Sequence, residues 1–197
     1  MLRDETRISS ILVYKPKDER IFLTLFMDNE KMSFYEQRTI KWDDRKNSVV
    51  MIDQTLLPNQ LSFVECSDVP SIIDAIKTMK VRGAPAIGVA GAMGVALAVQ
   101  RANARTKKEL LRKIEPDIIA LKSARPTAVN LAWGVDRTME ELKEKLPESF
   151  LDPEIARRIA VQFVEALADS DVTTNKKLSD LGAKLFRTGD SVLTHCN

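Results

Sequence analysis

The fold is decided by a stretch that opens with Arg82-Gly83-Ala84-Pro85 and continues as the apolar run AIGVAGAMGVALAV, residues 86–99. Proline is favoured just inside a helix start because the amide that it lacks has no partner there, so a helix is predicted to begin near Ala84. Unpaired amides of the first turn and the helix dipole attract anions. Arg82, beside the side-chain-free Gly83, lets an anion approach the backbone closely. The stretch therefore predicts an anion site at Arg82, Gly83 and Ala84; the alternative is a tight turn into a buried helix, with Arg82 merely solvated.

A second helix start of the same design follows Arg125-Pro126-Thr127, ahead of residues 128–133, with Thr127 as the predicted N-cap. Two arginines, each beside a helix N-terminus, suit a small phosphorylated or carboxylated ligand better than a polyanion. Standing alone, Arg125 would be interpreted as a surface residue at the end of the preceding helix.

Composition limits the function classes. With 197 residues, 44% of them hydrophobic, the chain can form one large domain, or one domain and part of another. Its 30 basic and 28 acidic side chains give a net charge of +2, which argues against nucleic-acid binding driven by bulk charge. Aromatic residues make up only 6% of the chain, so a base-stacking platform is not expected.

Metal binding and membrane insertion are not expected either. Cys66 and Cys196 lie far apart, His195 is the single histidine, and no metal-ligand spacing links them. No charged-then-apolar leader opens the sequence. Residues 83–99 are about as long as the shortest membrane span, but they are rich in glycine and alanine and flanked by arginines, so close packing in a soluble protein explains them better. A reduced, cytoplasmic setting is the default.

Short β-prone runs precede the helices. Residues 11–14 and 21–26 are typical of a hairpin with a polar turn or of a loosely ordered appendage, and both interpretations stay open. Residues 39–42 and 49–52, joined by turn residues, predict an antiparallel hairpin, and a further short strand is expected over 61–64.

Capping residues and apolar spacing predict four further helical features. Ser67 or Asp68 caps a helix, Thr106 opens another that reaches about Ser123, and Asp152-Pro153 starts a long one. Pro116 implies a kink or a break. The expected apolar side chains are Val69, Ile72, Ile73, Ile76 and Met79 in the first helix, and Ile155, Ile159, Phe163, Ala166 and Leu167 in the last.

Three glycines, Gly88, Gly91 and Gly94, recur every third residue inside the apolar run. Each costs roughly 1 kcal/mol relative to alanine in a helix interior. Close approach of another helix or backbone is the expected compensation, in preference to ligand contact.

The last residues, 191–197, predict a short buried strand that carries Cys196 near its carboxyl end, where ligands collect in open α/β sheets. No sheet for it to join is expected within this sequence, which suggests that a second, α/β domain is missing. Near helix amides and two arginines, the Cys196 thiol would deprotonate easily and act as nucleophile, acid or base. The alternative is an inert small hydrophobe, which is the interpretation given to Cys66.

Four blocks together resemble the methylthioribose-1-phosphate isomerases of methionine salvage: residues 52–58, IDQTLLP; 81–88, VRGAPAIG; 123–131, SARPTAVNL; and 189–197, GDSVLTHCN. The similarity covers about residues 38–197 and keeps the order of the blocks. The wider superfamily includes ribose-1,5-bisphosphate isomerase and the regulatory subunits of translation initiation factor 2B.

The resemblance implies a fold class between α+β and α/β. Residues 1–37 would be an extension of unknown role, residues 38–187 an α-rich domain with a small antiparallel sheet and a connecting helix, and residues 188–197 the first strand of a truncated Rossmann-like domain. It also implies a homodimer when full length.

The implied reaction converts an aldose 1-phosphate into the ketose 1-phosphate without metal or cofactor. Substrate would be bound by Arg82, Gly83, Ala84 and Arg125, and Cys196 would be catalytic. The family continues beyond the His-Cys-Asn motif into its remaining catalytic residues, so residues 1–197 alone are expected not to turn over substrate. Ribose-1,5-bisphosphate isomerase and a non-catalytic, initiation-factor-like regulatory subunit stay open as alternatives.

Overall fold

The computed structural model describes residues 10–13, 21–24, 38–149, 152–187 and 189–193. The chain divides into two compact units: residues 38–173, and a second formed by residues 1–37 with 174–197. His195, Cys196 and Asn197 lie outside the described residues.

A three-stranded antiparallel sheet opens the 38–173 unit, with strand order β3-β4-β5. The strands are β3 (Ile40–Asp43), β4 (Ser48–Ile52) and β5 (Phe63–Cys66). The predicted hairpin is confirmed, and the Asp43 carboxylate accepts hydrogen bonds from the amides of Arg45 and Lys46 in its turn, at 2.9 and 3.3 Å. The strand expected at 61–64 begins two residues later, because Phe63 is the residue that pairs with Ile52.

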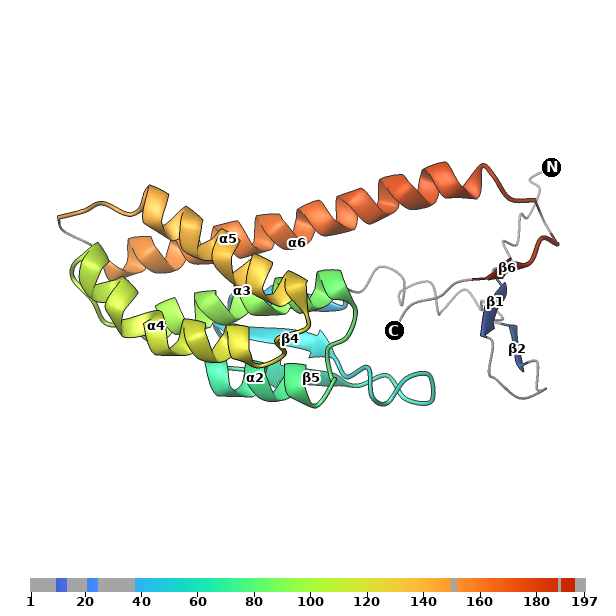
Figure 1. The fold of residues 1–197 in the computed structure, drawn as a ribbon, viewed down its shortest axis with the longest axis horizontal. Helices are drawn as coiled ribbons and strands as arrows, with labels where there is room; N and C mark the ends of the chain where they lie inside the picture. The colour runs from blue at the N-terminus through green and yellow to red at the C-terminus, as the bar shows by residue number, and fades with distance from the viewer. Residues whose placement is uncertain (1–9, 14–20, 25–37, 150–151, 188, 194–197) are drawn as a thin grey trace. The chain divides into compact units, whose positions relative to one another are not determined.

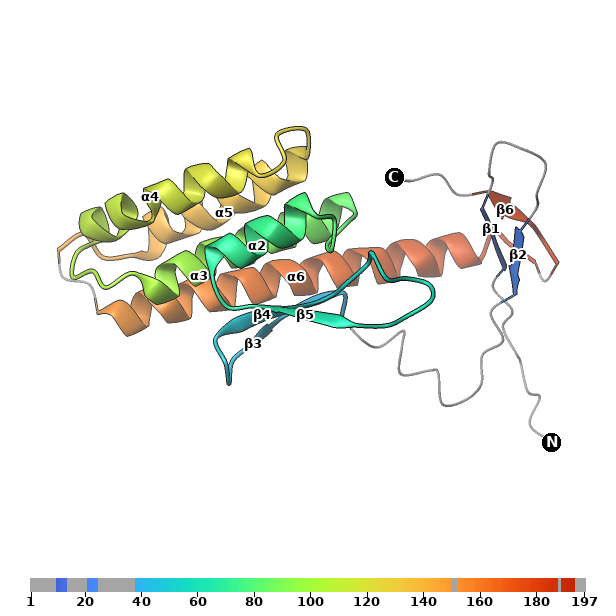
Figure 2. The same cartoon turned by 90° about the horizontal axis from the view of Figure 1, so that it is seen from below.

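Five helices follow: α2 (Val69–Lys77), α3 (Ala84–Arg101), α4 (Lys107–Ser123), α5 (Val129–Lys145) and α6 (Pro153–Ala183). Helix α3 lies at the centre of the unit, between the α4–α5 pair and the sheet (Figures 1 and 2). Every residue from Ile87 to Val99 is buried. By length and composition α3 is apolar enough to cross a membrane, but 72% of its apolar window is buried inside the fold, as in the core helix of a soluble protein.

The predicted caps hold at three of the four helix starts. Asp68 accepts from the Ser71 amide at 2.9 Å, Thr106 accepts from the Glu109 amide at 3.1 Å, and Asp152 accepts from the Glu154 amide at 3.0 Å. The prediction for α5 is wrong: Ala128, not Thr127, is its N-cap, and no side chain caps it. Helix α4 also runs continuously through Pro116, so of the two expected outcomes, a kink or a break, the break is absent.

Two expectations about the core need correction. Met79 lies beyond the end of α2 with φ +60° and is 48% exposed, whereas Val69, Ile72 and Ile76 are buried as expected. In α6 the fully buried positions are small residues displaced by about one position from the predicted stripe: Ala156, Ala160, Val161, Val164 and Ala168. The larger Ile159, Phe163 and Leu167 pack partly buried at the edge of that face.

The glycines of α3 lie where other helices approach most closely. A β-carbon on Gly91 would meet Leu131 Cδ1 at 2.7 Å, and one on Gly94 would meet Leu121 Cδ2 at 2.7 Å. The tightest contact belongs to α5, because a β-carbon on Gly134 would lie 2.1 Å from the Gly88 carbonyl oxygen. The expected helix approach is therefore confirmed, and part of it is backbone against backbone.

The second unit contains a sheet of order β2-β1-β6, formed by β1 (Ser10–Val13), β2 (Ile21–Thr24) and β6 (Val192–Leu193). Strands β1 and β2 pair antiparallel, which is the hairpin alternative. Strand β6 pairs parallel with β1. The expectation that the last strand has no sheet to join in this sequence is therefore wrong.

Gly134→Ala is predicted to destabilise the protein by at least about 2 kcal/mol, because the new methyl group overlaps a backbone carbonyl that cannot yield cheaply. Gly182→Ala is the matched control: it is also helical, its β-carbon would meet nothing within 4 Å, and the change is expected to be neutral or slightly stabilising. Urea midpoints of both variants test this, and equal midpoints would contradict it.

Candidate functional site: two helix starts at one end

The entry to α3 leaves backbone amides free. Gly83 is its N-cap with φ +87°, a left-handed conformation that favours glycine, and it offers no capping side chain. The Gly83 carbonyl accepts the Ile87 amide at 2.9 Å. Within the described residues the amides of Gly83, Ala84 and Ala86 donate to no backbone carbonyl, so they are available to an anion.

Arg82 is exposed, and its main chain is tied to the loop after β4. Gln54 Nε2 donates to the Arg82 carbonyl at 3.2 Å, and the Gln54 amide donates to the Lys80 carbonyl at 2.9 Å. The loop is closed by the Asp53 amide, which donates to the Ser62 carbonyl at 2.9 Å. The segment before α3 is thereby attached to the sheet.

The entry to α5 has the same character. Its N-cap, Ala128, has no side-chain hydrogen bond, and the Ala128 amide donates to the Arg125 carbonyl at 2.9 Å in the preceding turn. Arg125 is half-buried. Neither helix start is therefore capped by a side chain, and each follows an arginine.

Parallel packing brings the two starts to the same end of the unit. A β-carbon on Gly88, in the second turn of α3, would meet the Asn130 carbonyl oxygen, in the first turn of α5, at 3.0 Å. Further along, Gly91 faces Leu131 and Val135, so the two helices advance in the same direction. Figures 1 and 2 both show the two helices starting at the same end.

The two helix starts predicted to bind an anion therefore lie at the same end of the unit, whereas Cys196 lies outside the described residues. Cys66 is fully buried, and burial raises the pKa of its thiol, as the inert interpretation predicts. Gln54 was not among the predicted site residues. Its position inside the block 52–58 was the available signal, but sequence does not reveal a contact with a segment 28 residues away.

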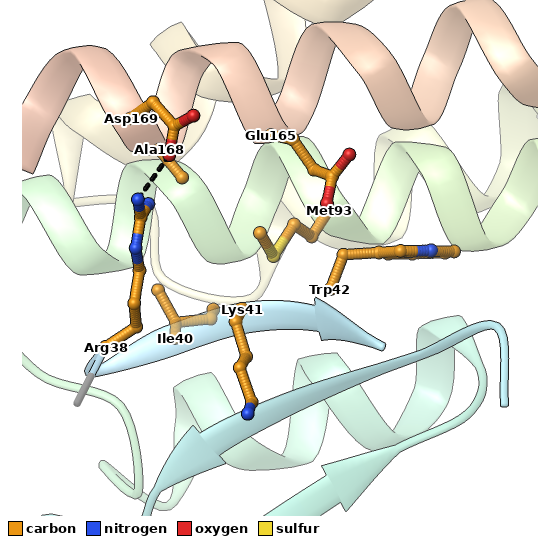
Figure 3. A pocket seen from close by; sticks show the side chains of 8 residues that line it. All are labelled: Arg38, Ile40, Lys41, Trp42, Met93, Glu165, Ala168 and Asp169. Atoms are coloured by element: carbon orange, nitrogen blue, oxygen red, sulfur yellow. Dashed lines mark ion pairs between the residues drawn. The ribbon is translucent and has the colours of Figure 1, made fainter. Parts of the chain in front are cut away.

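A separate cavity of about 330 Å³ lies between β3, α3 and α6, lined by Arg38, Ile40, Lys41, Trp42, Met93, Glu165, Ala168 and Asp169 (Figure 3). Arg38 forms an ion pair with Asp169 at its edge. Burial raises the pKa of the Glu165 carboxyl, the charges of Asp44 and Asp169 raise it further, and Arg38 opposes them. In the described part of the chain, no group of three His, Cys, Asp or Glu side chains is placed to hold a metal ion.

Comparison with known proteins places these features in a family. Residues 80–197 match the Initiation factor 2 subunit family. A Methanosarcina acetivorans protein with the provisional name of methylthioribose-1-phosphate isomerase is 44% identical over 160 residues, which cover 81% of this chain and 44% of that protein. The Pelotomaculum thermopropionicum methylthioribose-1-phosphate isomerase is 36% identical over 159 residues, which cover 81% of this chain and 43% of that enzyme.

Solved structures agree with the fold. The 5-methylthioribose 1-phosphate isomerase of Pyrococcus horikoshii superposes with a TM-score of 0.71 and 39% identity, covering 81% of this chain and 43% of that one. Translation initiation factor eIF-2B subunit delta of A. fulgidus superposes with a TM-score of 0.69 and 41% identity, covering 81% of this chain and 45% of that one. The chain thus spans less than half the length of these relatives.

Glu165→Gln is predicted to raise the melting temperature at pH 7 by at most about 2 °C, because Glu165 is only partly buried. A carboxyl whose pKa is raised by folding stabilises fully below its unfolded value, about 4.3, and this contribution is lost as the pH rises through the folded pKa. The advantage of the glutamine variant should therefore grow as the pH rises from the unfolded pKa through the folded pKa, and stay constant above it. Glu144→Gln, on the exposed face of α5, is the control, and an advantage that shrinks with rising pH contradicts the prediction.

Proposed function

The chain belongs to the Initiation factor 2 subunit family, and we propose that it forms the phosphate-binding amino-terminal part of a methylthioribose-1-phosphate isomerase. The observation that carries the proposal is the pair of uncapped helix starts, each preceded by an arginine, at one end of a parallel helix pair. Relatives with that enzyme's name, 36–44% identical over about 160 residues, support it.

In this proposal Arg82 and Arg125 bind the sugar phosphate together with the free amides of Gly83 and Ala84. Guanidinium groups form charge-assisted, bidentate hydrogen bonds with phosphate oxygens. The amides add donors whose positions are fixed by the helix, so the phosphate is held with little rearrangement. A phosphate held at a fixed place sets the position of the sugar carbon to which it is attached.

The chemistry follows from that placement. A phosphate on the anomeric carbon blocks simple ring opening, so the enzyme must open the ring while a proton moves between neighbouring carbons. A side chain beside the sugar that gives and takes protons meets this need. Cys196, which the resemblance matches to the family's catalytic cysteine, is proposed for that role.

The remaining expectations belong to the same proposal. Residues 188–197 would begin a Rossmann-like domain, the full-length protein would be a cytoplasmic homodimer, and its partner would be the sugar phosphate rather than nucleic acid or a membrane. No metal or cofactor would take part. Turnover would need the second half of the length that the relatives have.

A second candidate is a non-catalytic subunit that binds partners. The similarity to the A. fulgidus eIF-2B delta structure favours it, because the TM-score of 0.69 and the identity of 41% are close to those found with the isomerase. Ribose-1,5-bisphosphate isomerase differs from the first proposal in the group at the far end of the sugar, a second phosphate instead of a methylthio group.

Arg82→Ala and Arg125→Ala are each predicted to weaken binding of methylthioribose 1-phosphate by about 10- to 100-fold, the usual effect of losing a charge-assisted hydrogen bond. Isothermal titration of the chain measures this. Arg112→Ala is the matched control, since Arg112 is an exposed arginine in the second turn of α4, a helix whose start follows the opposite end of α3. Equal weakening in all three variants would show that only net charge matters.

The catalytic half of the proposal needs a separate assay. The reading frame is followed past codon 197, and the longer product is tested for conversion of methylthioribose 1-phosphate, with Cys196→Ser beside it. Conversion that Cys196→Ser lowers at least about 100-fold is expected. Activity on ribose 1,5-bisphosphate alone supports the alternative isomerase, and activity on neither sugar supports the non-catalytic subunit.

A further inference from the structure

We propose that Gln54 is a positioning residue: its side-chain amide fixes the peptide between Arg82 and Gly83, so that the Gly83 N–H faces the bound anion. This inference rests on the proposed function, which places a sugar phosphate at the start of α3. It adds to the site Gln54, a residue of the loop after β4 that does not itself touch the ligand.

The geometry of one peptide group carries the inference. Gln54 Nε2 donates to the Arg82 carbonyl oxygen at 3.2 Å. The peptide that holds this carbonyl is trans, and in a planar trans peptide the C=O and the N–H point in opposite directions. Holding the Arg82 carbonyl toward Gln54 therefore turns the Gly83 N–H away from Gln54, to a side on which no carbonyl of the described residues accepts it.

Side-chain packing on Gly83 does not fix this peptide, because a β-carbon built on Gly83 would meet nothing within 4 Å. Glycine also rotates between positive and negative φ at low cost, and here it has φ +87° without a capping side chain. An unheld Arg82–Gly83 peptide would sample orientations in which its N–H turns away from the ligand. The hydrogen bond from Gln54 favours one of these orientations.

Gln54 is itself held, so it can act as a fixed point. Its own amide donates to the Lys80 carbonyl at 2.9 Å. The preceding residue, Asp53, is buried; its carboxylate accepts from the Thr55 amide at 3.0 Å and from the Thr55 hydroxyl at 2.6 Å. The backbone contact to Lys80 does not depend on the Gln54 side chain. A substitution at Gln54 therefore removes only the side-chain hydrogen bond to the Arg82 carbonyl.

Gln54→Met tests the inference, because methionine is close in size to glutamine and cannot donate a hydrogen bond. We expect the dissociation constant for inorganic phosphate and for methylthioribose 1-phosphate to rise about 3- to 10-fold, the effect of one neutral hydrogen bond. The Gly83 amide signal in a nitrogen–proton correlation spectrum should respond less to added phosphate than it does in the parent chain. The melting temperature should change by less than about 2 °C.

Gln60→Met, an exposed glutamine of the same loop, is the matched control and should bind as the parent does. Gln54→Leu repeats the measurement with a second side chain that cannot donate. If Arg82→Ala weakens binding but neither Gln54 variant does, or if the Gly83 response is unchanged, the inference is wrong and the proposed function stands. If Arg82→Ala itself binds like the parent, the proposed function fails first.

Discussion

The contact between α3 and α5 at Gly88 and Gly134 is the constraint on which the 38–173 unit depends. A β-carbon on Gly134 would lie 2.1 Å from the Gly88 carbonyl oxygen, so the helices meet backbone to backbone there. Such a contact requires a glycine, because any side chain at position 134 would force the helices apart. Since the two helices run the same way past this point, their unpaired first-turn amides emerge together. The same contact therefore determines both the packing of the core and the composition of the candidate site.

The candidate site combines helices that are fixed by burial with a turn that is fixed partly by hydrogen bonds. The helix bodies are fixed by burial, since every residue of α3 from Ile87 to Val99 lies inside the core. In the turn before α3, Val81 is buried in the core, but a β-carbon on Gly83 would meet nothing within 4 Å. Hydrogen bonds from Gln54, in the loop after β4, to the carbonyls of Lys80 and Arg82 add to that packing. A positive-φ glycine that is free of side-chain contacts gives a ligand close access to the backbone. Because no side chain packs on it, a hydrogen bond must help to fix the orientation of its peptide group.

Local chemistry explains which features the sequence could predict. Residues close together in the chain form the β3–β4 hairpin and the Asp68 and Thr106 caps. The glycine contacts of α3 were predictable because glycine destabilises a helix interior, so a close helix contact was expected to offset that loss. Two of the failures involve tertiary contacts: the buried face of α6 consists of small residues that allow close packing, and β6 pairs with β1 from the far end of the chain. The third is the N-cap of α5, which is Ala128 and not Thr127. Gln54 acts on a segment 28 residues away, which no local pattern encodes.

The comparisons join an isomerase and an initiation-factor subunit to this chain with nearly equal similarity. That is physically reasonable under the proposed function, because two arginines and a set of helix amides can bind a phosphate group whether or not a reaction follows. Phosphate binding alone therefore does not separate the two functions. The difference must lie in a group that exchanges protons with the sugar, and the candidate for it, Cys196, comes from the opposite end of the sequence to the loop that holds Arg82. In the proposed function, binding and chemistry are thus assigned to different segments of the chain.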